Sequence, residues 1–377
     1  MRDFEAGKWL MQTGFRSFEP TPINRQWRID EPRVLEALSR ADRNLGRLDM
    51  FSEYVPNLDL FVRMHVAKEA TESSRIEDTQ TEMEEALLPE EEILEERRDD
   101  WREVNNYISA MDDAISALAE LPFSTRLLKR AHATLMSGVR GEHKTPGEFR
   151  RSQNWIGGSN PGNARFVPPI QENVPELMGD LDLFAHNGEL HLPPLLKVAI
   201  MHYQFETIHP FLDGNGRIGR LMVPLYLVSQ GILKKPVLYL SDYLERNREE
   251  YYERLTRVRS ENAIDDWLHF FLDGLSETAA RGVETFSQIL KFKTHWEAEI
   301  SSWKPQAASG LALFQFLFTN VWVNAQIVSK ATGVSQPTAY KLIERFVDCG
   351  LLREMTGAKR GRLFLFEPYL KLFKQRD

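Results

Sequence analysis

One stretch of the chain, from Ile208 to Met222, gathers side chains that are suited to binding a polyphosphate. Its glycines can take a positive φ and let backbone N–H groups close on an anion, and the helix expected to follow adds its positive N-terminal end. Arg217 and Arg220 lie three residues apart, so on a helix they share one face and both can reach the same polyphosphate. Asp213 is placed to bind a Mg²⁺ ion that bridges phosphate oxygens.

His209 stands near the start of this stretch and could supply the proton transfer. An imidazole titrates near neutral pH, so His209 could accept the proton of an attacking hydroxyl. A lone histidine is more often a buried structural residue, and a pair of arginines is more often a solvated helix face. The glycines, the carboxylate and the amide between them favour a catalytic site instead.

The same stretch resembles the signature of the Fic family, His-Pro-Phe-x-Asp/Glu-Gly-Asn-Gly-Arg-x-x-Arg, and matches it at every fixed position. Fic enzymes mostly transfer AMP from ATP to a Ser, Thr or Tyr hydroxyl of a target protein, which predicts a nucleotidyltransferase. The resemblance implies that His209 is the catalytic base and that Mg²⁺ accompanies ATP, with Asp213 as the metal ligand. Within the signature it implies ATP-binding roles for Asp213, Gly214, Asn215, Gly216, Arg217, Gly219 and Arg220.

The resemblance also implies the direction of the reaction. A target hydroxyl would attack the α-phosphorus in line and diphosphate would leave, and the enzyme would also modify itself. Related Doc kinases bind the nucleotide the other way round and carry a lysine in place of the second motif glycine. Gly216 occupies that position here, which favours AMP transfer over phosphoryl transfer.

A segment upstream of the signature could restrain this activity. Ser73 and Glu77 match the Ser/Thr-x-x-x-Glu-Gly/Asn motif of Fic proteins that carry an inhibitory helix, while Asp78 departs from its last position. Asp fits the left-handed end of a helix less well than Gly or Asn. By resemblance, the Glu77 carboxylate would pair with Arg220 and fill the space of the γ-phosphate. Glu77 could instead position a water that removes AMP from a modified protein, and the sequence leaves both roles open.

Residues 147–169 interrupt the helical pattern and predict two short strands around a long turn. Fic enzymes carry a hairpin, the flap, at this place, and it aligns the target side chain over the active site. An exposed strand edge there could pair with an extended segment of another protein. The implied target-docking residues are Ile156, Gly157, Gly158, Arg165 and Phe166.

Aromatic and amide side chains downstream of the signature are candidates for the adenine pocket, because the family places tyrosine and asparagine there. Spacing alone does not choose among Tyr243, Asn247, Tyr251, Tyr252 and Asn262. We take Tyr243, Tyr251 and Asn262 as the candidate ATP-binding residues outside the signature.

A mainly α-helical body must position these residues. From Glu31 onward, apolar residues at helical spacing predict helices that include 58–73, 101–119, 127–136, 192–207, 220–230 and 241–258, with 265–275 closing the domain. We expect an extended arm over 1–30, a solvated helix surface and linker over 82–100, and a connecting helix over 276–304. The expected fold is a Fic helical fold with a β-hairpin flap, divided into an N-terminal region (1–100), a catalytic domain (101–290) and a C-terminal unit (291–377).

The C-terminal unit resembles a winged helix-turn-helix domain. Residues 324–329 and 338–347 are predicted helices around a turn at Gly333, and strands around a basic turn follow them. Residues 305–377 hold ten basic and five acidic residues, a net charge of +5, whereas the whole chain carries −8. This asymmetry favours DNA binding through residues 324–366, although such domains also bind proteins or form homodimers. The alternative function is a DNA-binding regulator whose Fic domain senses a nucleotide.

The composition of the chain indicates the cellular compartment in which we expect the protein. The chain has 377 residues, one cysteine, and no apolar signal-peptide core at its N-terminus. A single cysteine excludes an internal disulfide framework and fits a reducing environment. The most apolar run, residues 311–323, contains polar side chains and is too short to span a bilayer. We therefore expect a cytoplasmic protein that enters no membrane.

Overall fold

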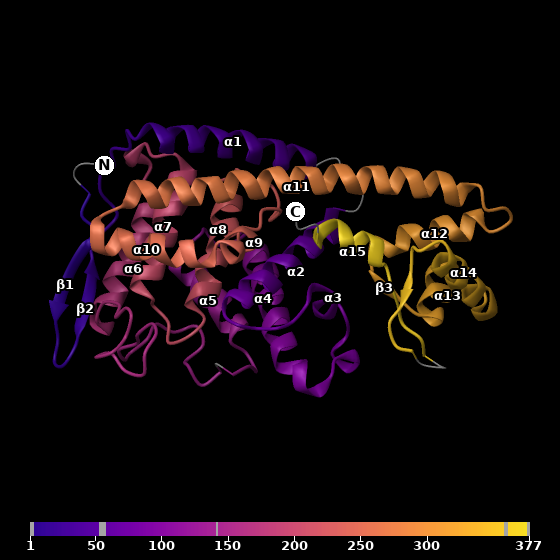
Figure 1. The fold of residues 1–377 in the computed structure, drawn as a ribbon, viewed down its shortest axis with the longest axis horizontal. Coiled ribbons are helices and arrows are strands. Elements are labelled where there is room, and N and C mark those ends of the chain that lie inside the picture. The colour runs from indigo at the N-terminus through magenta and orange to yellow at the C-terminus, as the bar shows by residue number, and fades with distance from the viewer. Residues whose placement is uncertain (1–3, 53–57, 141, 358–360, 375–377) are drawn as a thin grey trace.

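The computed structural model describes residues 4–52, 58–140, 142–357 and 361–374. Most of the described chain is helical. The helices between residues 32 and 261, which surround the signature, are called the catalytic body after the predicted catalytic domain. The long helix α11 runs along one side of the molecule from this body to the C-terminal unit (Figure 1). None of the described helices is both long enough and apolar enough to cross a bilayer. The α-helices are α1 (Pro32–Ser52), α2 (Leu58–Ile76), α3 (Met83–Ala86), α4 (Arg98–Ala117), α5 (Thr125–Leu135), α6 (Val174–His186), α7 (Pro194–Ile208), α8 (Asn215–Ser229), α9 (Ser241–Arg246), α10 (Arg248–Glu261), α11 (Ile264–Ser301), α12 (Ala307–Leu317), α13 (Ala325–Thr332), α14 (Gln336–Asp348) and α15 (Glu367–Lys374).

The strands and short 3₁₀ turns complete the fold. Strands β1 and β2 form an antiparallel hairpin, and β3, β5 and β4 form a second antiparallel sheet in that order. The strands are β1 (Gly7–Met11), β2 (Arg16–Pro20), β3 (Trp322–Val323), β4 (Arg353–Glu354) and β5 (Phe364–Leu365), and the 3₁₀ turns are η1 (Glu90–Glu92), η2 (Glu95–Arg97), η3 (Gln171–Asn173) and η4 (Gly188–Leu190).

Helices α7 and α8 form the centre of the catalytic body. Every residue of α7 from Leu195 to Ile208 is buried, which agrees with its apolar sequence on all sides. Helix α7 begins at Pro194, where a proline is well tolerated, and ends at His209 in the left-handed region. Helix α8 begins immediately after Gly214. The signature therefore lies where one buried helix ends and the next begins.

Helix α11 differs from the prediction of a domain-closing segment followed by a separate connecting helix. It is one continuous helix of 38 residues, and α1 packs along it. The apolar stripe does not stop at residue 275, because Ala279, Val283, Phe286 and Ile289 continue it at helical spacing and are buried. The predicted break was therefore wrong, and the chain passes between the two units without a flexible joint at that point.

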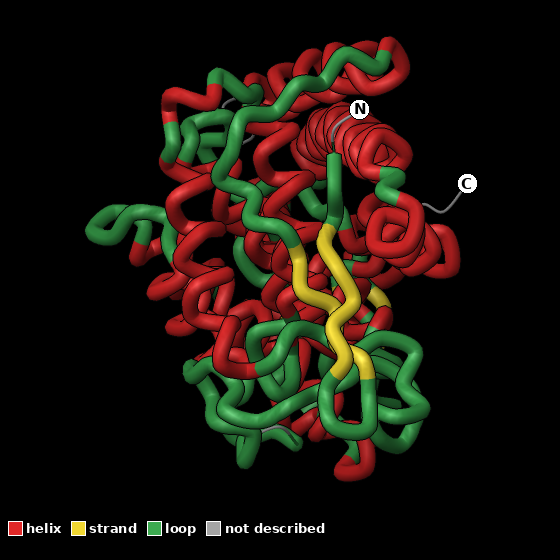
Figure 2. Tube along the Cα trace, turned by 90° about the vertical axis from the view of Figure 1, so that its left-hand side faces the viewer, coloured by secondary structure: helices red, strands yellow, loops and turns green. Residues whose placement is uncertain are grey.

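The N-terminal arm is a β-hairpin rather than an extended segment. Trp9 of β1 lies opposite Phe18 of β2, and Phe18 is fully buried. The N–H group of Phe18 donates to the carbonyl of Val167 at 2.9 Å, which joins the hairpin to the end of the predicted flap. Figure 2 shows the two strands running down to the loops at the foot of the catalytic body.

The acidic segment 82–100 is more ordered than the predicted solvated linker. Glu82 and Glu85 form a capping box at the start of α3, and most apolar residues from Met83 to Ile93 are buried. Leu88 and Ile93 pack with Leu363 of the C-terminal unit. The segment thus connects the catalytic body to that unit. The predicted helix over 241–258 is also divided, into α9 and α10, at Asn247.

The C-terminal unit has the helix and strand order expected from its sequence. Helices α13 and α14 are joined through Gly333 at φ 71°, and β4 and β5 follow them. Lys359 and Arg360 of the predicted basic turn lie outside the described residues. The winged helix-turn-helix assignment stays a prediction. Helix α15 returns to the catalytic body, where Phe373 packs against Phe61 and His65 of α2.

Candidate active site

The signature loop is closed by its own side chains. The backbone N–H of Phe211 donates to the Oδ1 atom of Asn215 at 2.8 Å, and the Nδ2 atom of Asn215 donates back to the Phe211 carbonyl at 2.9 Å. Gly214 has φ 71°, a conformation that glycine adopts without strain. The first backbone N–H groups of α8 have no partner within the helix, so this turn presents donors to an anion.

Two flap residues that the sequence analysis missed hold this loop in place. The Nε atom of Arg150 donates to the carbonyl of His209 at 3.0 Å, and the Nδ2 atom of Asn154 donates to the carbonyls of His209 and Phe211 at 3.1 and 2.9 Å. Both side chains are almost fully buried. Their sequence carries no signal for this role, because the partners are backbone atoms more than 50 residues away.

The imidazole of His209 is suited to accept a proton. Burial, followed by the positive charge of Arg150, lowers the pKa of His209 to about 4. At neutral pH the ring is therefore uncharged and has a free lone pair. His209 itself has φ 50°, and its backbone N–H ends α7 by donating to Phe205 at 2.9 Å.

His132 of α5 is a second histidine of the site, and the sequence analysis did not identify it. Its ring stacks on Phe211 with centroids 3.8 Å apart. The Nδ1 atom accepts from the N–H of Gly147 at 2.8 Å, and the Nε2 atom lies 3.0 Å from the carbonyl of Asp213. Nδ1 accepts, so Nε2 carries the proton and donates to Asp213. Burial lowers the pKa of His132 to about 4, so it stays a neutral bridge between α5 and the loop.

The carboxylate of Glu77 lies at the N-terminal end of α8. Its Oε1 atom is 2.8 Å from the Nη2 atom of Arg220, and a Cβ atom at Gly216 would overlap it. Ser73, one helical turn earlier on α2, accepts from Arg220 through both its hydroxyl (2.8 Å) and its carbonyl (2.9 Å). Burial opposes ionisation of Glu77, but the charge and the hydrogen bond of Arg220, together with the charge of Arg217, act against it, and the pKa of Glu77 is lowered. The helix that carries Ser73 and Glu77 is thus tied to the signature by its last turn.

The end of α2 explains how Asp78 is accommodated. Asp78 has φ 67°, and its N–H donates to the carbonyl of Arg75 at 3.0 Å. Its carboxylate accepts from Arg248 at 3.1 Å. Asp78 therefore takes the left-handed position that Gly or Asn would occupy more easily.

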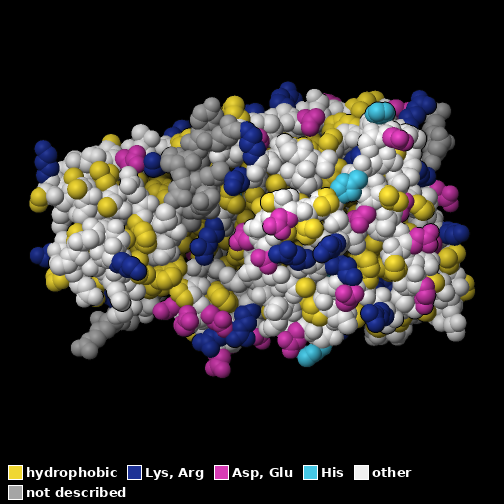
Figure 3. Space-filling view, turned by 180° about the vertical axis from the view of Figure 1, so that it is seen from behind, with side chains coloured by type: hydrophobic (Ala, Val, Ile, Leu, Met, Phe, Trp, Pro, Cys, Tyr) yellow, Lys and Arg dark blue, Asp and Glu magenta, His cyan; other side chains and the backbone are white. Residues whose placement is uncertain are grey.

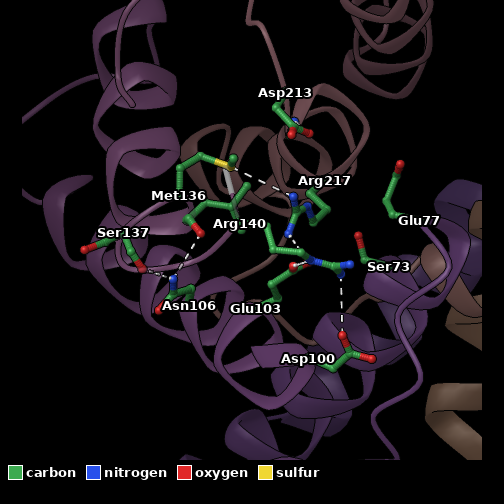
Figure 4. A network of polar contacts seen from close by, with 12 residues as sticks. Ser73, Glu77, Asp100, Glu103, Asn106, Met136, Ser137, Arg140, Asp213 and Arg217 are labelled. Carbon is green, nitrogen blue, oxygen red and sulfur yellow. Dashed lines mark hydrogen bonds and ion pairs between the residues drawn. The ribbon is translucent and has the colours of Figure 1, made fainter. Parts of the chain in front are cut away.

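Arg217 does not share the partner of Arg220. Its Nη1 atom lies 3.1 Å from the Oε2 atom of Glu103 on α4, and both side chains are 7% exposed. Glu103 also accepts from Arg140 at 2.9 Å (Figure 4). The expected convergence of both arginines on one anion is therefore replaced by two separate ion pairs. Glu103 lies 114 residues before Arg217, which is why no local pattern indicates the contact.

Asp213 is exposed at the start of α8. Its Oδ1 atom accepts from the N–H of Gly214 at 2.7 Å. Among the described residues, no three His, Cys, Asp or Glu side chains gather into a metal site. A single carboxylate beside an anion-binding turn fits Mg²⁺ that takes its other ligands from phosphates and water.

Gly219 packs closely against α7, and its predicted role in ATP binding stays a prediction. A Cβ atom there would overlap the Glu206 carboxylate on α7, and its carbonyl accepts from His202 at 2.9 Å. Tyr251 donates to the other nitrogen of His202 at 2.9 Å. Tyr251 is buried, so its hydroxyl fixes α10 against α7.

Tyr243 and Asn262, the other two predicted adenine-pocket residues, contact parts of the chain outside the signature. Tyr243 lies against Gly274 and Phe270 of α11, and Asn262 accepts from the backbone N–H of Ala6 at 2.8 Å. Neither residue contacts the signature in the described part of the chain. Burial, followed by the charge of Glu77, raises the pKa of Tyr252, which we did not select.

The predicted flap strands reduce to one antiparallel bridge between Ile156 and Phe166. Gly157 and Gly158 follow Ile156 with φ 68° and 74° and turn the chain, and Arg165 donates from its backbone to Ile156 at 3.0 Å. The five predicted docking residues thus lie together, although the loop between them has no regular strand.

Two family models match most of the catalytic body. Residues 35–116 match the Fic/DOC family N-terminal model, and residues 122–227 match the Fic/DOC family model. A protein adenylyltransferase Fic of Aedes aegypti is 33% identical over 133 residues, which cover 35% of this chain and 24% of that protein. A probable protein adenylyltransferase of Aquifex aeolicus is 37% identical over 119 residues, which cover 32% of each chain. The chain therefore spans only about a quarter to a third of these relatives.

Solved structures show the same fold at low identity. A Fic family protein from Desulfovibrio desulfuricans G20 superposes with a TM-score of 0.59 at 20% identity, over 91% of this chain and 98% of that one. A Fic domain-containing signalling protein from Bacteroides thetaiotaomicron gives a TM-score of 0.52 at 18% identity, over 69% of this chain and 97% of that one.

Proposed function

The chain belongs to the Fic/DOC family, and we propose that it is a protein adenylyltransferase that transfers AMP from ATP to hydroxyl groups of a target protein and of itself. One observation carries the proposal. A neutral imidazole, His209, lies beside the N-terminus of α8, where the Glu77 carboxylate already occupies the position of an anion. The names of its relatives, protein adenylyltransferases, support the same reaction.

Residues of the signature have separate roles in the proposed reaction. His209 accepts the proton of the attacking hydroxyl as its oxygen bonds to the α-phosphorus and the bond to diphosphate breaks. The first N–H groups of α8 and the guanidinium groups of Arg217 and Arg220 hold phosphate charge. Asp213 would hold Mg²⁺, which neutralises phosphate charge when it is bound.

Glu77 restrains the reaction in this proposal. Its carboxylate and the ATP γ-phosphate would compete for Arg220 and for the space over Gly216. The pair between Glu77 and Arg220 stabilises the restrained arrangement, because Arg220 is only 1% exposed and Glu77, although 40% exposed, neutralises its charge. Productive binding of ATP therefore requires that Glu77 leaves.

Intact-mass analysis after incubation with Mg²⁺ and ATP tests the proposal on three proteins: wild type, Glu77→Gly, and Glu77→Gly with His209→Ala. We expect added AMP masses on Glu77→Gly, fewer on the wild type, and none on the double variant. Labelling that persists without His209 would rule out its role as the base.

Removal of AMP is the alternative that Glu77 itself could support, by positioning a water. Purified AMP-modified protein, incubated with the wild type and with Glu77→Gly, separates the two roles. Loss of AMP that depends on Glu77 would favour removal, whereas stable modification with both proteins would favour transfer.

A further inference from the structure

The N-terminal hairpin and the flap form one continuous surface. Besides the hydrogen bond from Phe18 to Val167, three rings from the two segments pack together. The ring centroid of Trp9 lies 5.2 Å from that of Phe18 and 6.0 Å from that of Phe166, and Phe18 and Phe166 are 6.1 Å apart. Contacts of this kind hold two segments in a fixed relation. A protein segment that binds at the flap would therefore also contact the hairpin.

Buried contacts connect this surface with His209. The guanidinium group of Arg259 lies 3.9 Å from the centroid of the Phe166 ring, and its Nε atom donates to the hydroxyl of Thr207 at 3.1 Å. Thr207 is two residues before His209, and on the other strand of the flap Asn154 binds the His209 carbonyl. A segment bound along the flap is thereby aligned with the base.

A groove of about 430 Å³ lies between the hairpin and the flap. Trp9, Met11 and Pro161 give it apolar walls, and Met11 is 76% exposed. Its only charged lining residues are Arg16 and Arg165, both exposed, and neither pairs with a carboxylate among the described residues. Arg16 lies over the ring of Trp9 at 5.8 Å. The groove thus offers apolar contact next to two unneutralised positive charges.

We propose that this groove binds an extended acidic segment of the target protein, with an apolar side chain against Trp9 and a carboxylate between Arg16 and Arg165. The inference rests on the proposed adenylyltransferase function and names the chemistry of its substrate. A carboxylate suits the two guanidinium groups, since arginine pairs with carboxylates through two parallel hydrogen bonds. β1 pairs only with β2 among the described strands, which leaves its other edge open to an extended chain.

A peptide library tests the proposal. Each peptide carries one Ser, Thr or Tyr acceptor, and flanking positions are varied between Asp/Glu and Lys/Arg, with an apolar or polar neighbour. The enzyme is full-length Glu77→Gly, and AMP incorporation from Mg²⁺-ATP is measured. We expect at least about a tenfold preference for acidic over basic peptides, since a good charge-assisted contact contributes about 1.5–3 kcal/mol. Arg16→Glu with Arg165→Glu should reverse this preference.

The ratio between acidic and basic peptides is the readout, so a general loss of rate or of folded protein does not imitate the result. Arg126→Glu is the matched control, because Arg126 is exposed on α5 and does not line the groove. It should leave the ratio unchanged. Equal rates for both peptide classes, or no peptide labelling while Glu77→Gly still labels itself, would overturn the inference alone. Absence of any labelling, including self-labelling, would overturn the adenylyltransferase function with it.

Discussion

At the scale of residues, the site is governed by two arginines that each face a carboxylate. Arg220 pairs with Glu77 from α2, and Arg217 pairs with Glu103 from α4. Both arginines are almost fully buried, so each needs an anion nearby. Under the proposed function, phosphate groups of the nucleotide would replace these carboxylates. Glu103 would then hold Arg217 in its buried conformation until the nucleotide binds.

The Glu103 pair leads to a stability prediction. Glu103→Ala removes the partner of a buried arginine, which should lower the free energy of unfolding by about 3–5 kcal/mol. Mg²⁺-ATP should restore part of this loss, so the increase in midpoint on adding ATP should be larger for Glu103→Ala than for its parent. Urea unfolding with and without Mg²⁺-ATP measures both effects in the Glu77→Gly background.

Asp99→Ala is the control, because Asp99 pairs with Arg102 at 3.3 Å on the surface of the same helix, where Asp99 is 71% exposed. Its loss should change the free energy of unfolding by less than about 1 kcal/mol. Equal destabilisation by both substitutions would contradict the buried role of Glu103.

The pKa of His209 gives a prediction about pH. The pKa of His209 is lowered to about 4, so the base stays neutral and active as the pH falls through 6.5. A histidine with the ordinary pKa of about 6.5 would lose about tenfold in rate at pH 5.5. Removing Glu77, whose charge raises the pKa of His209, lowers that pKa further. We expect kcat/KM of Glu77→Gly to change by less than about twofold between pH 8 and 5.5, and a tenfold fall would contradict this environment.

The residue types of the site were readable from the sequence, but their partners were not. The signature and the Ser73–Glu77 motif are local patterns, and the structure brings Ser73 and Glu77 to Arg220. Glu103, Arg150, Asn154 and His132 act through contacts with residues far along the chain, often with backbone atoms. Spacing in one sequence carries no trace of such contacts. The same limit explains why Asn262 was assigned to the adenine pocket, because its partner, the backbone N–H of Ala6 just before the hairpin, is distant in the sequence.

At the scale of elements, the end of α2 decides how firmly Glu77 is held. Asp78 ends the helix at φ 67°, which strains any residue other than glycine. Helix periodicity predicted most helices close to their observed bounds, because apolar faces determine them. Two of the elements that were wrong depend on distant contacts: the hairpin on Val167, and segment 82–100 on Leu363. The break predicted after residue 275 was wrong for a local reason, because the apolar stripe of α11 continues beyond it.

Asp78→Gly should tighten the restraint. Relief of the left-handed strain should raise the free energy of unfolding by about 0.5–1 kcal/mol, and a better ordered helix end should lower AMP labelling by the otherwise wild-type protein. Asp78→Ala, which also removes the contact with Arg248 but keeps a Cβ atom, should instead weaken the helix end and raise labelling. Thermal unfolding and intact mass measure the two effects, and the same change of labelling in both variants would disprove this role.

At the scale of the whole molecule, the C-terminal unit packs against α2, the helix that precedes Glu77. The Phe373 ring of α15 lies 5.8 Å from Phe61 and 5.1 Å from His65, and Lys374 pairs with Glu84 beside α3. Ser73 lies in the last turn of the same helix, and Glu77 follows its last residue. A change in how the C-terminal unit packs on α2 can therefore alter the pair between Glu77 and Arg220.

Phe373→Ala should raise AMP labelling of the otherwise wild-type protein severalfold, because α2 loses packing that favours the restrained arrangement. Phe318→Ala is the control, since Phe318 is buried within the C-terminal unit against Phe314 and Phe366. It should destabilise that unit without a comparable rise in labelling. Equal labelling by the two variants would show that the unit does not act through α2.

Several basic side chains of the C-terminal unit already have partners, which leaves fewer positive charges for DNA binding. Arg345 lies over the Trp303 ring at 4.2 Å, Arg353 pairs with Glu367 at 2.7 Å, and Lys374 pairs with Glu84. Figure 3 shows basic and acidic side chains interspersed over the face it views. On α14 the exposed residues include Lys341 but also Glu344 and Asp348. DNA binding stays a prediction, with fewer free positive charges than the sequence suggested.

The most direct test of the central claim follows the two ends of ATP. Wild type, Glu77→Gly and Glu77→Gly with His209→Ala are incubated with Mg²⁺ and ATP labelled either at the α-phosphate or at the γ-phosphate, and protein-bound label is measured. AMP transfer predicts α-label on the protein, most on Glu77→Gly and none on the double variant, with no γ-label on any of them. Protein-bound γ-label, or α-label that does not increase when Glu77 is removed, would contradict the account.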